Sequence, residues 1–216
     1  MGERCIVILS GGPDSTTLAY WAKAEGYEAH AIIFNYGQRA QREIEYAVKT
    51  AERLNMPYKV LDISSLKELY TGVTSLVDPG MKVASSFEGS LIVPFRNGIF
   101  LSIAVAYASS IGARRIFYGA HIEDGSFYPD CRREFYKAFE ASARLGTGEE
   151  ITIEAPFGDI PKSEILRRGY ELGVPYELTW SCYLNGPKHC GVCESCRNRR
   201  MAFREAGLTD PTEYEE

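Results

Sequence analysis

Short apolar runs alternate along the chain with longer segments in which apolar residues recur every three or four positions. Short runs of this kind are typical of buried strands, and the periodic segments are typical of helices. Their regular alternation predicts an α/β fold with an open, mostly parallel sheet. The expected strands lie at residues 5–9, 29–34, 58–63, 116–119 and 150–155, and the expected helices at 13–26, 39–54, 98–111, 133–143, from 162 onwards and at 195–206.

The helix expected at 98–111 is apolar nearly all round, which predicts a central position in the fold. It is too short, and too often interrupted by serine, to be interpreted as a membrane span. Residues 64–90 are less regular and contain several glycines and a proline. They predict a loop or lid over the ligand-binding end of the sheet, with a disordered surface segment as the alternative.

The sequence Leu9-Ser10-Gly11-Gly12-Pro13-Asp14-Ser15-Thr16 joins the first strand to the first helix. Backbone N–H groups at a helix start lack intrahelical acceptors and, with the helix dipole, favour a bound phosphate. Gly11 and Gly12 are expected to let the anion approach the backbone, because they lack a Cβ. Asp14 is expected to hold Mg²⁺ beside the phosphates or to cap backbone amides. An ordinary capped turn is the alternative, and neither a Walker A loop nor a dinucleotide fingerprint fits the glycine spacing.

Ser10-Gly11-Gly12-x-Asp14-Ser15-Thr16 resembles the pyrophosphate loop of the ATP pyrophosphatase (PP-loop) superfamily. Members typically cut ATP between its α and β phosphates and adenylate an oxygen of their substrate. Ligands of parallel sheets collect outside the carboxyl ends of the strands, so the end of the second strand is expected near this loop. The backbone at Phe34 would then meet the adenine, with Tyr36 nearby, and a plain Asn/Gly turn is the alternative.

Polar residues also gather after the fourth strand and at the starts of two helices. Asp124 and Asp130 are expected to accept hydrogen bonds from a purine-like ring on which Phe95 or Phe127 stacks, although such acids also occur as turn residues. Lys162 opens a helix against the dipole, so it is expected to reach the ATP phosphates, with a solvent-facing lysine as the alternative.

Arg96 and Asn97 stand at the mouth of the apolar helix. The planar guanidinium of Arg96 suits phosphate or carboxylate. The alternative has Asn97 as a helix cap and Arg96 as a surface charge.

Four cysteines, Cys182, Cys190, Cys193 and Cys196, cluster near the end of the chain, and the last three are spaced Cys-x-x-Cys-x-x-Cys. Four thiolates at this spacing predict a structural zinc site, with an iron–sulfur cluster as the main rival. His189 is a weaker candidate ligand, since a neighbour of Cys190 rarely reaches the same ion. The zinc would fasten residues 179–206 to the main domain. The arginines that follow predict a solvated helix face, with nucleic-acid contact as the alternative: Arg197, Arg199, Arg200 and Arg204.

Composition narrows the class of protein. A length of 216 residues suits a single domain over 1–216 with its own core. The net charge of −5 argues against a strong grip on a nucleic-acid backbone. Six cysteines without a secretory signal indicate metal binding or reduced thiols, hence a cytoplasmic protein. Cys5 is expected in the core, and Cys131 in a structural role rather than as a catalytic thiol.

Several motifs together resemble the 7-cyano-7-deazaguanine synthase family, and they span nearly the whole chain. The most specific are Tyr128-Pro129-Asp130-Cys131-Arg132 and Trp180-Ser181-Cys182 with the three later cysteines. Val93-Pro94-x-Arg96-Asn97, Tyr118-Gly119-Ala120-His121 and Lys162-Ser163-Glu164 also match, whereas Pro13 departs from the family pattern. The resemblance implies a Rossmann-like sheet of the adenine nucleotide alpha-hydrolase type and a homodimer.

The resemblance also implies a reaction in which ATP activates 7-carboxy-7-deazaguanine and ammonium supplies the nitrogen of 7-cyano-7-deazaguanine, for queuosine or archaeosine. AMP and pyrophosphate are favoured over ADP and phosphate as products. Rival hypotheses are an ATP-dependent tRNA-modifying enzyme and a non-catalytic zinc protein that binds nucleotide. The implied catalytic residues are Asp14, Arg96 and Lys162; the implied ATP contacts are Ile8, Leu9, Ser10, Gly11, Gly12, Pro13, Asp14, Ser15, Thr16, Thr17, Leu18, Phe34, Tyr36 and Gly119; and the implied substrate contacts are Phe95, Asn97, Asp124, Tyr128, Asp130 and Arg132.

Overall fold

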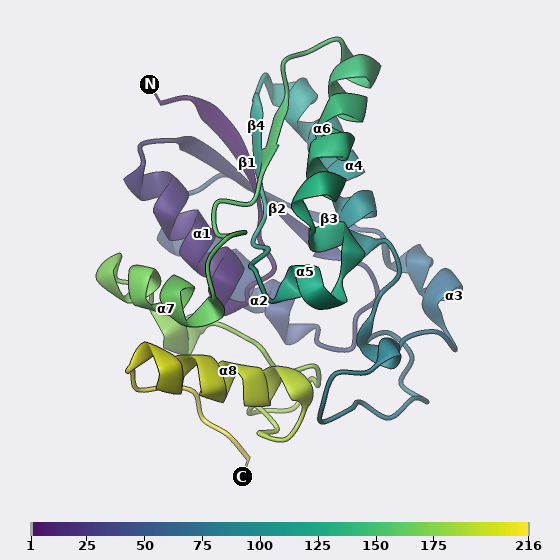
Figure 1. The fold of residues 1–216 in the computed structure, drawn as a ribbon, viewed down its shortest axis with the longest axis vertical. Helices are drawn as coiled ribbons and strands as arrows, with labels where there is room; N and C mark the ends of the chain where they lie inside the picture. Colours follow the sequence, from purple (N-terminus) through teal and green to yellow (C-terminus); the bar gives the residue numbers. More distant parts are fainter. Residues whose placement is uncertain (1, 216) are drawn as a thin grey trace.

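Five strands pair in parallel into a single twisted sheet in the order β3-β2-β1-β4-β5 (Figure 1). The computed structural model describes residues 2–215. The fold confirms the predicted α/β class and the five parallel strands, with shifts of at most two residues at their ends. The strands are β1 (Arg4–Ile8), β2 (Glu28–Asn35), β3 (Tyr58–Asp62), β4 (Arg115–Phe117) and β5 (Thr152–Glu154).

Helices cover both faces of the sheet because successive side chains of each central strand point to opposite sides. Val7 of β1 packs in the core formed with α1, α2 and α7, whereas Ile6 packs in the core formed with α4 and α6. Helix α8 lies across the bottom of the view in Figure 1 and packs on α7. The helices are α1 (Pro13–Ala24), α2 (Arg42–Arg53), α3 (Lys67–Tyr70), α4 (Arg96–Ile111), α5 (Asp124–Phe127), α6 (Arg133–Thr147), α7 (Lys162–Glu171) and α8 (Glu194–Ala206).

Helix α4 covers the sheet instead of lying at the centre of the fold, which corrects the prediction. Leu101, Ala104 and Ala108 are buried, whereas Ser102 and Ser110 on the opposite side are exposed. Within the described residues, Gly89–Ile111 is the one stretch long and apolar enough to cross a membrane by length and composition. Helices that pack in the core of a soluble protein pass the same test, and α4 packs against β1, β4 and α6.

Residues 64–90 form an ordered excursion that is fastened to the rest of the chain. It contains short helical turns at Ser64–Leu66, Lys67–Tyr70 and the start of Gly89–Leu91. The backbone amide of Arg39 donates to the carbonyl of Leu76 at 2.8 Å, and the Arg39 side chain donates to the carbonyl of Met81 at 2.9 Å. These bonds occupy residues 39–41 in a turn, which is why α2 begins at Arg42 and not at the predicted residue 39.

The strand order places a crevice between β1 and β4. From β1 the chain continues to β2 and β3 on one side, whereas β4 and β5 lie on the other side. In open parallel sheets, this reversal leaves a gap between the loops at the carboxyl ends of the two central strands. The loop after β1 and the loop after β4 therefore face each other across the place where a ligand is expected.

Arg199 of α8 is fully buried, which corrects the prediction of a solvated arginine face for this residue. Its guanidinium donates to Thr179 Oγ1 at 2.7 Å and to the carbonyl of Tyr176 at 2.9 Å, and Nε donates to Asp210 Oδ1 at 3.1 Å. The helix thereby ties the segment before the cysteine cluster to the segment after it. Arg197 and Arg204 of the same helix are exposed, as predicted.

Arg199→Ala is expected to lower the free energy of unfolding by about 3–5 kcal/mol, because it leaves the largely buried Asp210 carboxylate without its positively charged partner. Urea unfolding followed by circular dichroism measures the loss. Arg197→Ala on the exposed side of α8 is the matched control, with a change within about 0.5 kcal/mol. Equal effects of the two substitutions would contradict the structural role of Arg199.

Candidate functional site

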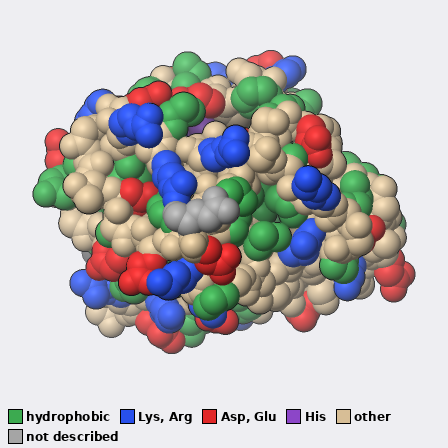
Figure 2. Space-filling view, turned by 90° about the horizontal axis from the view of Figure 1, so that it is seen from below, with side chains coloured by type: hydrophobic (Ala, Val, Ile, Leu, Met, Phe, Trp, Pro, Cys, Tyr) green, Lys and Arg blue, Asp and Glu red, His purple; other side chains and the backbone are tan. Residues whose placement is uncertain are grey.

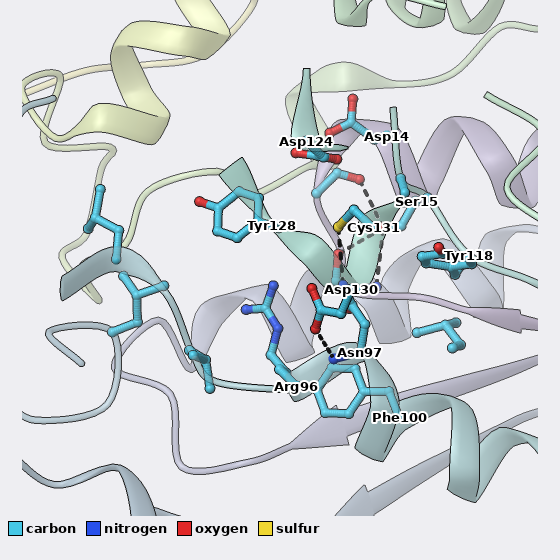
Figure 3. A pocket seen from close by; sticks show the side chains of 18 of the residues that line it. Asp14, Ser15, Arg96, Asn97, Phe100, Tyr118, Asp124, Tyr128, Asp130 and Cys131 are labelled. Carbon is cyan, nitrogen blue, oxygen red and sulfur yellow. Dashed lines mark hydrogen bonds between the residues drawn. The ribbon is translucent and has the colours of Figure 1, made fainter. Parts of the chain in front are cut away.

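A cavity of about 240 Å³ opens between the loops that follow β1 and β4 and the start of α4 (Figure 3). The volume lies just below the roughly 300–1,000 Å³ that is typical of drug-sized ligands, so it suits a small molecule. Its walls combine carboxylates, an arginine and aromatic rings. The lining residues are Ile8, Ser10, Gly12, Asp14, Ser15, Leu76, Leu91, Val93, Arg96, Asn97, Phe100, Tyr118, Gly119, Ala120, Asp124, Tyr128, Asp130, Cys131 and Tyr183.

The loop between β1 and α1 is held in shape by its own hydroxyl groups. The backbone amide of Ser10 donates to Ser15 Oγ at 3.1 Å, and the two serine hydroxyls lie 3.0 Å apart. Pro13 occupies the first position of α1, where the missing N–H costs nothing. The amide of Ser15, in the first turn of α1, has no intrahelical acceptor and is available to an anion.

Two glycines allow this loop to pack against its neighbours. Gly11 has a φ of 82°, and a Cβ there would stand 2.2 Å from the carbonyl oxygen of Glu43 in α2. A Cβ on Gly119 would stand 3.2 Å from the backbone nitrogen of Ser15. Close packing on α2 and a positive φ therefore require glycine at position 11, in addition to the predicted approach of an anion.

Asp14 and Lys162 form a partly buried ion pair beside the loop, with 2.6 Å between Asp14 Oδ2 and Lys162 Nζ. Burial favours the neutral carboxyl, but the charge of Lys162 and its hydrogen bond outweigh burial and lower the pKa of Asp14. The same pairing raises the pKa of Lys162 despite its burial. Asp14 Oδ1 is buried and has no hydrogen-bond partner among the described residues, so it remains available to a cation or another donor.

Arg96 enters the cavity from a strained turn. Phe95, the residue before it, has a φ of 56°, which is rare for a bulky residue. Arg96 donates to the hydroxyl of Tyr36 at 3.1 Å. Burial opposes the guanidinium charge, but Tyr36 and the more distant Glu43 favour it, so the pKa of Arg96 is raised. A charged guanidinium therefore faces the cavity at any physiological pH.

Asp130 and Cys131 lie against the start of α4. The backbone amide of Asn97 donates to Asp130 Oδ2 at 3.0 Å, and the Asn97 side-chain amide lies 3.2 Å from the Cys131 sulfur. Burial raises the pKa of the Cys131 thiol, and the carboxylates of Asp124 and Asp130 add to the shift. The thiol therefore stays protonated, which argues against a nucleophilic thiolate.

Asp124 stands at the end of the cavity that also holds Asp14 (Figure 3). Its carboxylate accepts from the backbone amide of His121 at 3.1 Å and lies 3.4 Å from His121 Nε2. His121 Nδ1 lies 2.7 Å from Glu123 Oε2. Burial raises the pKa of Asp124 and repulsion from Asp14 adds to the rise, although His121 and Lys162 oppose it.

The structure brings about half of the predicted site residues to the cavity wall. Leu9 and Leu18 are in the core, Thr17 bonds Tyr176, and Phe34 stacks on Phe100 at 4.1 Å. Phe95 and Phe127 are largely exposed, so neither ring reaches the cavity. The predicted residues outside the lining are Leu9, Gly11, Pro13, Thr16, Thr17, Leu18, Phe34, Tyr36, Phe95, Arg132 and Lys162; those within it are Ile8, Ser10, Gly12, Asp14, Ser15, Arg96, Asn97, Gly119, Asp124, Tyr128 and Asp130.

Most of the lining residues that the sequence analysis missed are apolar or aromatic. Leu76 and Leu91 come from the excursion at 64–91, which therefore borders the cavity as a lid would. Tyr183 comes from the segment between the first two clustered cysteines. Its position directly after Cys182 could have marked it in the sequence as a candidate site residue. Apolar residues carry no comparable signal, because the same residue types fill the core.

The sulfurs of Cys182, Cys190, Cys193 and Cys196 all lie within 4.8 Å of one another, as predicted, and all four residues are buried. The sulfurs of Cys190 and Cys196 are 4.0 Å apart, close to the roughly 3.8 Å edge of a tetrahedron with metal–sulfur bonds of about 2.3 Å. The thiolates of an iron–sulfur cube bind separate irons and must spread further apart. The backbone amides of Leu184 and Cys193 point at cluster sulfurs. The donor set therefore fits one ion of the zinc type.

The cysteine cluster is connected to the loop after β1. The backbone amide of Trp180 donates to the carbonyl of Gly11 at 2.9 Å, and Trp180 Nε1 donates to the carbonyl of Cys182 at 2.8 Å. Tyr183 lines the cavity, and its hydroxyl donates to Glu194 at 2.8 Å. His189 Nε2 accepts a hydrogen bond from the Ser181 amide, and the metal-binding group consists of the four cysteines. This agrees with the prediction that His189 is the weaker candidate ligand.

Cys193→Ala is expected to lose the bound metal and several kcal/mol of stability together, since metal binding at such sites is coupled to folding. Metal content by elemental analysis and the thermal midpoint measure the two effects. Cys5→Ala, which removes a thiol from the opposite end of the core, is the control and keeps the metal. A folded Cys193→Ala protein with unchanged stability would contradict a structural metal.

Comparison with solved structures agrees with the fold. An NMN synthetase from Francisella tularensis superposes with a TM-score of 0.55 at 18% identity, covering 96% of this chain and 78% of that one. A 4-thiouridine synthetase in complex with RNA and bound ATP superposes with a TM-score of 0.56 at 18% identity, covering 95% of this chain and 50% of that one. At this identity, the likeness concerns the fold alone.

Comparison of sequences identifies the family. A 7-cyano-7-deazaguanine synthase from Caldicellulosiruptor bescii is 48% identical over 98% of this chain and 97% of its own length. A synthase of the same name from Methanoregula boonei is 41% identical over 98% of this chain and 99% of its own length. The family described as queuosine biosynthesis protein QueC matches residues 4–207. The chain is therefore an enzyme of the QueC family.

Proposed function

We propose that the chain converts 7-carboxy-7-deazaguanine, ATP and ammonia into 7-cyano-7-deazaguanine, the product after which its relatives are named. The observation that carries this proposal is the arrangement of one cavity. A phosphate-type loop with the Asp14–Lys162 pair borders one end, and carboxylate, amide and aromatic groups line the rest. An activating nucleotide and a small heterocyclic acid therefore meet in one place.

The loop after β1 is the proposed site for the ATP phosphates. The amide of Ser15 and the hydroxyls of Ser10 and Ser15 supply donors at the start of α1, where the helix dipole favours an anion. The buried, unpartnered Asp14 Oδ1 fits Mg²⁺, which prefers carboxylate oxygens and phosphates. Bound there, the metal would supply positive charge beside the phosphates.

In the first step, the substrate carboxylate attacks the α-phosphate of ATP, an acyl-adenylate forms, and pyrophosphate leaves. Negative charge develops on the leaving oxygens, so nearby fixed cations lower the barrier. Lys162, held by Asp14, and Arg96, held by Tyr36, are the proposed cations. The ion pair to Asp14 holds Lys162 and the hydrogen bond to Tyr36 holds Arg96 in place before the reaction, so little reorganisation is required.

The deazapurine ring is proposed to bind between the start of α4 and the turn at 128–131. A guanine-like edge presents N–H donors, and Asp130 retains acceptor capacity after its bond with Asn97. Tyr128 and Phe100 supply flat apolar surface in the same cavity. These residues replace Phe95 and Phe127, the predicted stacking partners, which lie outside it.

Ammonia then displaces AMP and gives the amide. A second activation, of the amide oxygen, followed by loss of the phosphorylated oxygen and a proton, gives the nitrile. Water would hydrolyse both activated species, so the site must exclude it. The apolar wall of Leu76, Leu91 and Val93 is the proposed barrier, since it covers the cavity from the excursion side.

The four-cysteine site is proposed to hold zinc in a structural role, with residues 179–206 as a subregion of one domain. All four positions are filled by protein thiolates, whereas catalytic zinc keeps one position open. The chain is also proposed to act as a cytoplasmic homodimer without a stable nucleic-acid partner. Acidic and basic side chains alternate over the face shown in Figure 2, which lacks a continuous basic patch among its described residues.

Asp14→Asn is expected to lower turnover by at least about 10²-fold, because it removes the negative charge that positions Lys162 and that is proposed to hold Mg²⁺. The assay contains ATP, Mg²⁺, ammonium and the carboxy-deazapurine. Mass spectrometry follows the base, and phosphorus NMR separates AMP with pyrophosphate from ADP with phosphate. Asp159→Asn, at an exposed acid ahead of α7, is the matched control with wild-type turnover. Near-normal turnover of Asp14→Asn would remove this loop from the mechanism.

A further inference from the structure

The Asp124–His121–Glu123 group links the cavity to solvent and has no part in the steps above. Asp124 lines the cavity with a side chain that is 25% exposed, His121 beside it is 9% exposed, and Glu123 beyond it is 47% exposed. The Asp124 and His121 side chains are 3.4 Å apart, and those of His121 and Glu123 are 2.7 Å apart. Three proton-carrying groups therefore run in sequence from the cavity to the surface.

We propose that Asp124 is the base that deprotonates the ammonium substrate, and that His121 and Glu123 carry the proton from it to solvent. This role rests on the proposed function, in which ammonia is the nitrogen nucleophile, and assigns the group that generates ammonia from ammonium. Ammonium cannot attack, because its nitrogen has no lone pair until a proton leaves.

Charge at this end of the cavity favours an ammonium ion. Asp14 and Asp124 place two carboxylates at this end of the cavity, and the one positive charge of Lys162 is paired with Asp14, which leaves one uncompensated negative charge among these three side chains. A small cation is thus attracted to the place where the base stands.

Among the titratable groups that border the cavity, Asp124 is the one suited to accept a proton. The pKa of Asp14 is lowered by Lys162, which makes it a weak base, and Asp130 holds the start of α4. Burial raises the pKa of Tyr118, of Cys131 and of Tyr128, the last to about 12, so all three keep their protons. Burial raises the pKa of Asp124 towards the working pH, which strengthens it as a base.

The step balances as follows. Asp124 takes one proton from ammonium, the freed lone pair forms the C–N bond, and the C–O bond to AMP breaks with its electron pair leaving on AMP. The nitrogen loses a second proton as the adduct collapses, so two protons leave for each amide formed. The first passes from Asp124 to His121 Nε2 while Nδ1 releases a proton to Glu123, and exchange with solvent returns Glu123 and the imidazole to their starting protonation. The second leaves the protonated amide, a strong acid, for the phosphate of the departing AMP and does not require Asp124.

The test separates adenylation from nitrogen transfer. Exchange of labelled pyrophosphate into ATP, measured with the carboxy-deazapurine and without ammonium, reports adenylation alone. Amide plus nitrile formed from ammonium reports the complete path. Hydroxylamine is uncharged at neutral pH and needs no base to expose its lone pair, so hydroxamate formation bypasses Asp124.

Asp124→Asn is expected to lower the rate with ammonium by about 10²–10⁴-fold, the usual contribution of a general base. His121→Gln and Glu123→Gln, which interrupt the relay outside the cavity, lower it less. All three variants are expected to keep pyrophosphate exchange and to form hydroxamate within a few-fold of wild type. Glu134→Gln, at an exposed acid of α6, is the control and keeps every rate.

Three results would overturn the proposal. Loss of pyrophosphate exchange in Asp124→Asn would assign this carboxylate to the nucleotide or its metal. An equal fall with ammonium and hydroxylamine would assign it to positioning of the heterocycle. Wild-type rates with ammonium in His121→Gln and Glu123→Gln would remove the relay. If the wild-type enzyme itself showed neither exchange nor amide, the proposed function would fail first.

Discussion

The loop after β1 packs closely against neighbours on three sides, so its backbone has little freedom to shift. Gly11 lies against the backbone of α2, Gly119 at the end of β4 lies against Ser15, and the Trp180 amide donates to the Gly11 carbonyl. Each contact involves backbone atoms, which cannot move aside as a flexible side chain does. The positions of Asp14 and of the amides at the start of α1 follow from this packing, and the cavity is built around them.

Charge inside the site is arranged in pairs. Lys162 is neutralised by Asp14, and the guanidinium of Arg96 donates to the neutral hydroxyl of Tyr36. Pairing offsets much of the cost of burying an ion and fixes the direction in which it points. The Asp124 carboxylate is the exception, since the side chain that it lies against is the imidazole of His121 and not a lysine or arginine. The site thus holds fixed charges where phosphate is expected and a titratable one where a proton must move.

Much of the fold was predictable because local patterns determined it. The strand, glycine turn and helix from 5 to 26 are encoded by neighbouring residues, and the Cys-x-x-Cys-x-x-Cys spacing brings thiolates together over one short segment. The family followed from motifs such as the one around Asp130. What the sequence did not predict depends on tertiary packing. The sequence pattern predicts four surface arginines in this helix, but Arg199 is buried and bonded to Thr179 and Asp210.

Tertiary packing also limits how much of the site could be predicted. Polar residues at strand ends were predicted, because parallel sheets collect ligands there, but Leu76 and Leu91 come from an irregular segment without a recognisable motif. Phe95 was a reasonable stacking partner by residue type. Its left-handed backbone turns the ring against Gly98 and Phe135 instead, and the sequence carries no sign of that conformation.

The position of Trp180 gives the molecule an internal optical reporter. The indole packs on His189 with 4.2 Å between ring centroids, and its nitrogen donates to the Cys182 carbonyl while its backbone amide holds the Gly11 carbonyl. The second tryptophan, Trp21, is packed on Phe117 and Phe157 on the opposite side of α1. Intrinsic fluorescence of a Trp21→Phe protein would therefore come from a single indole that senses both the cysteine cluster and the loop after β1.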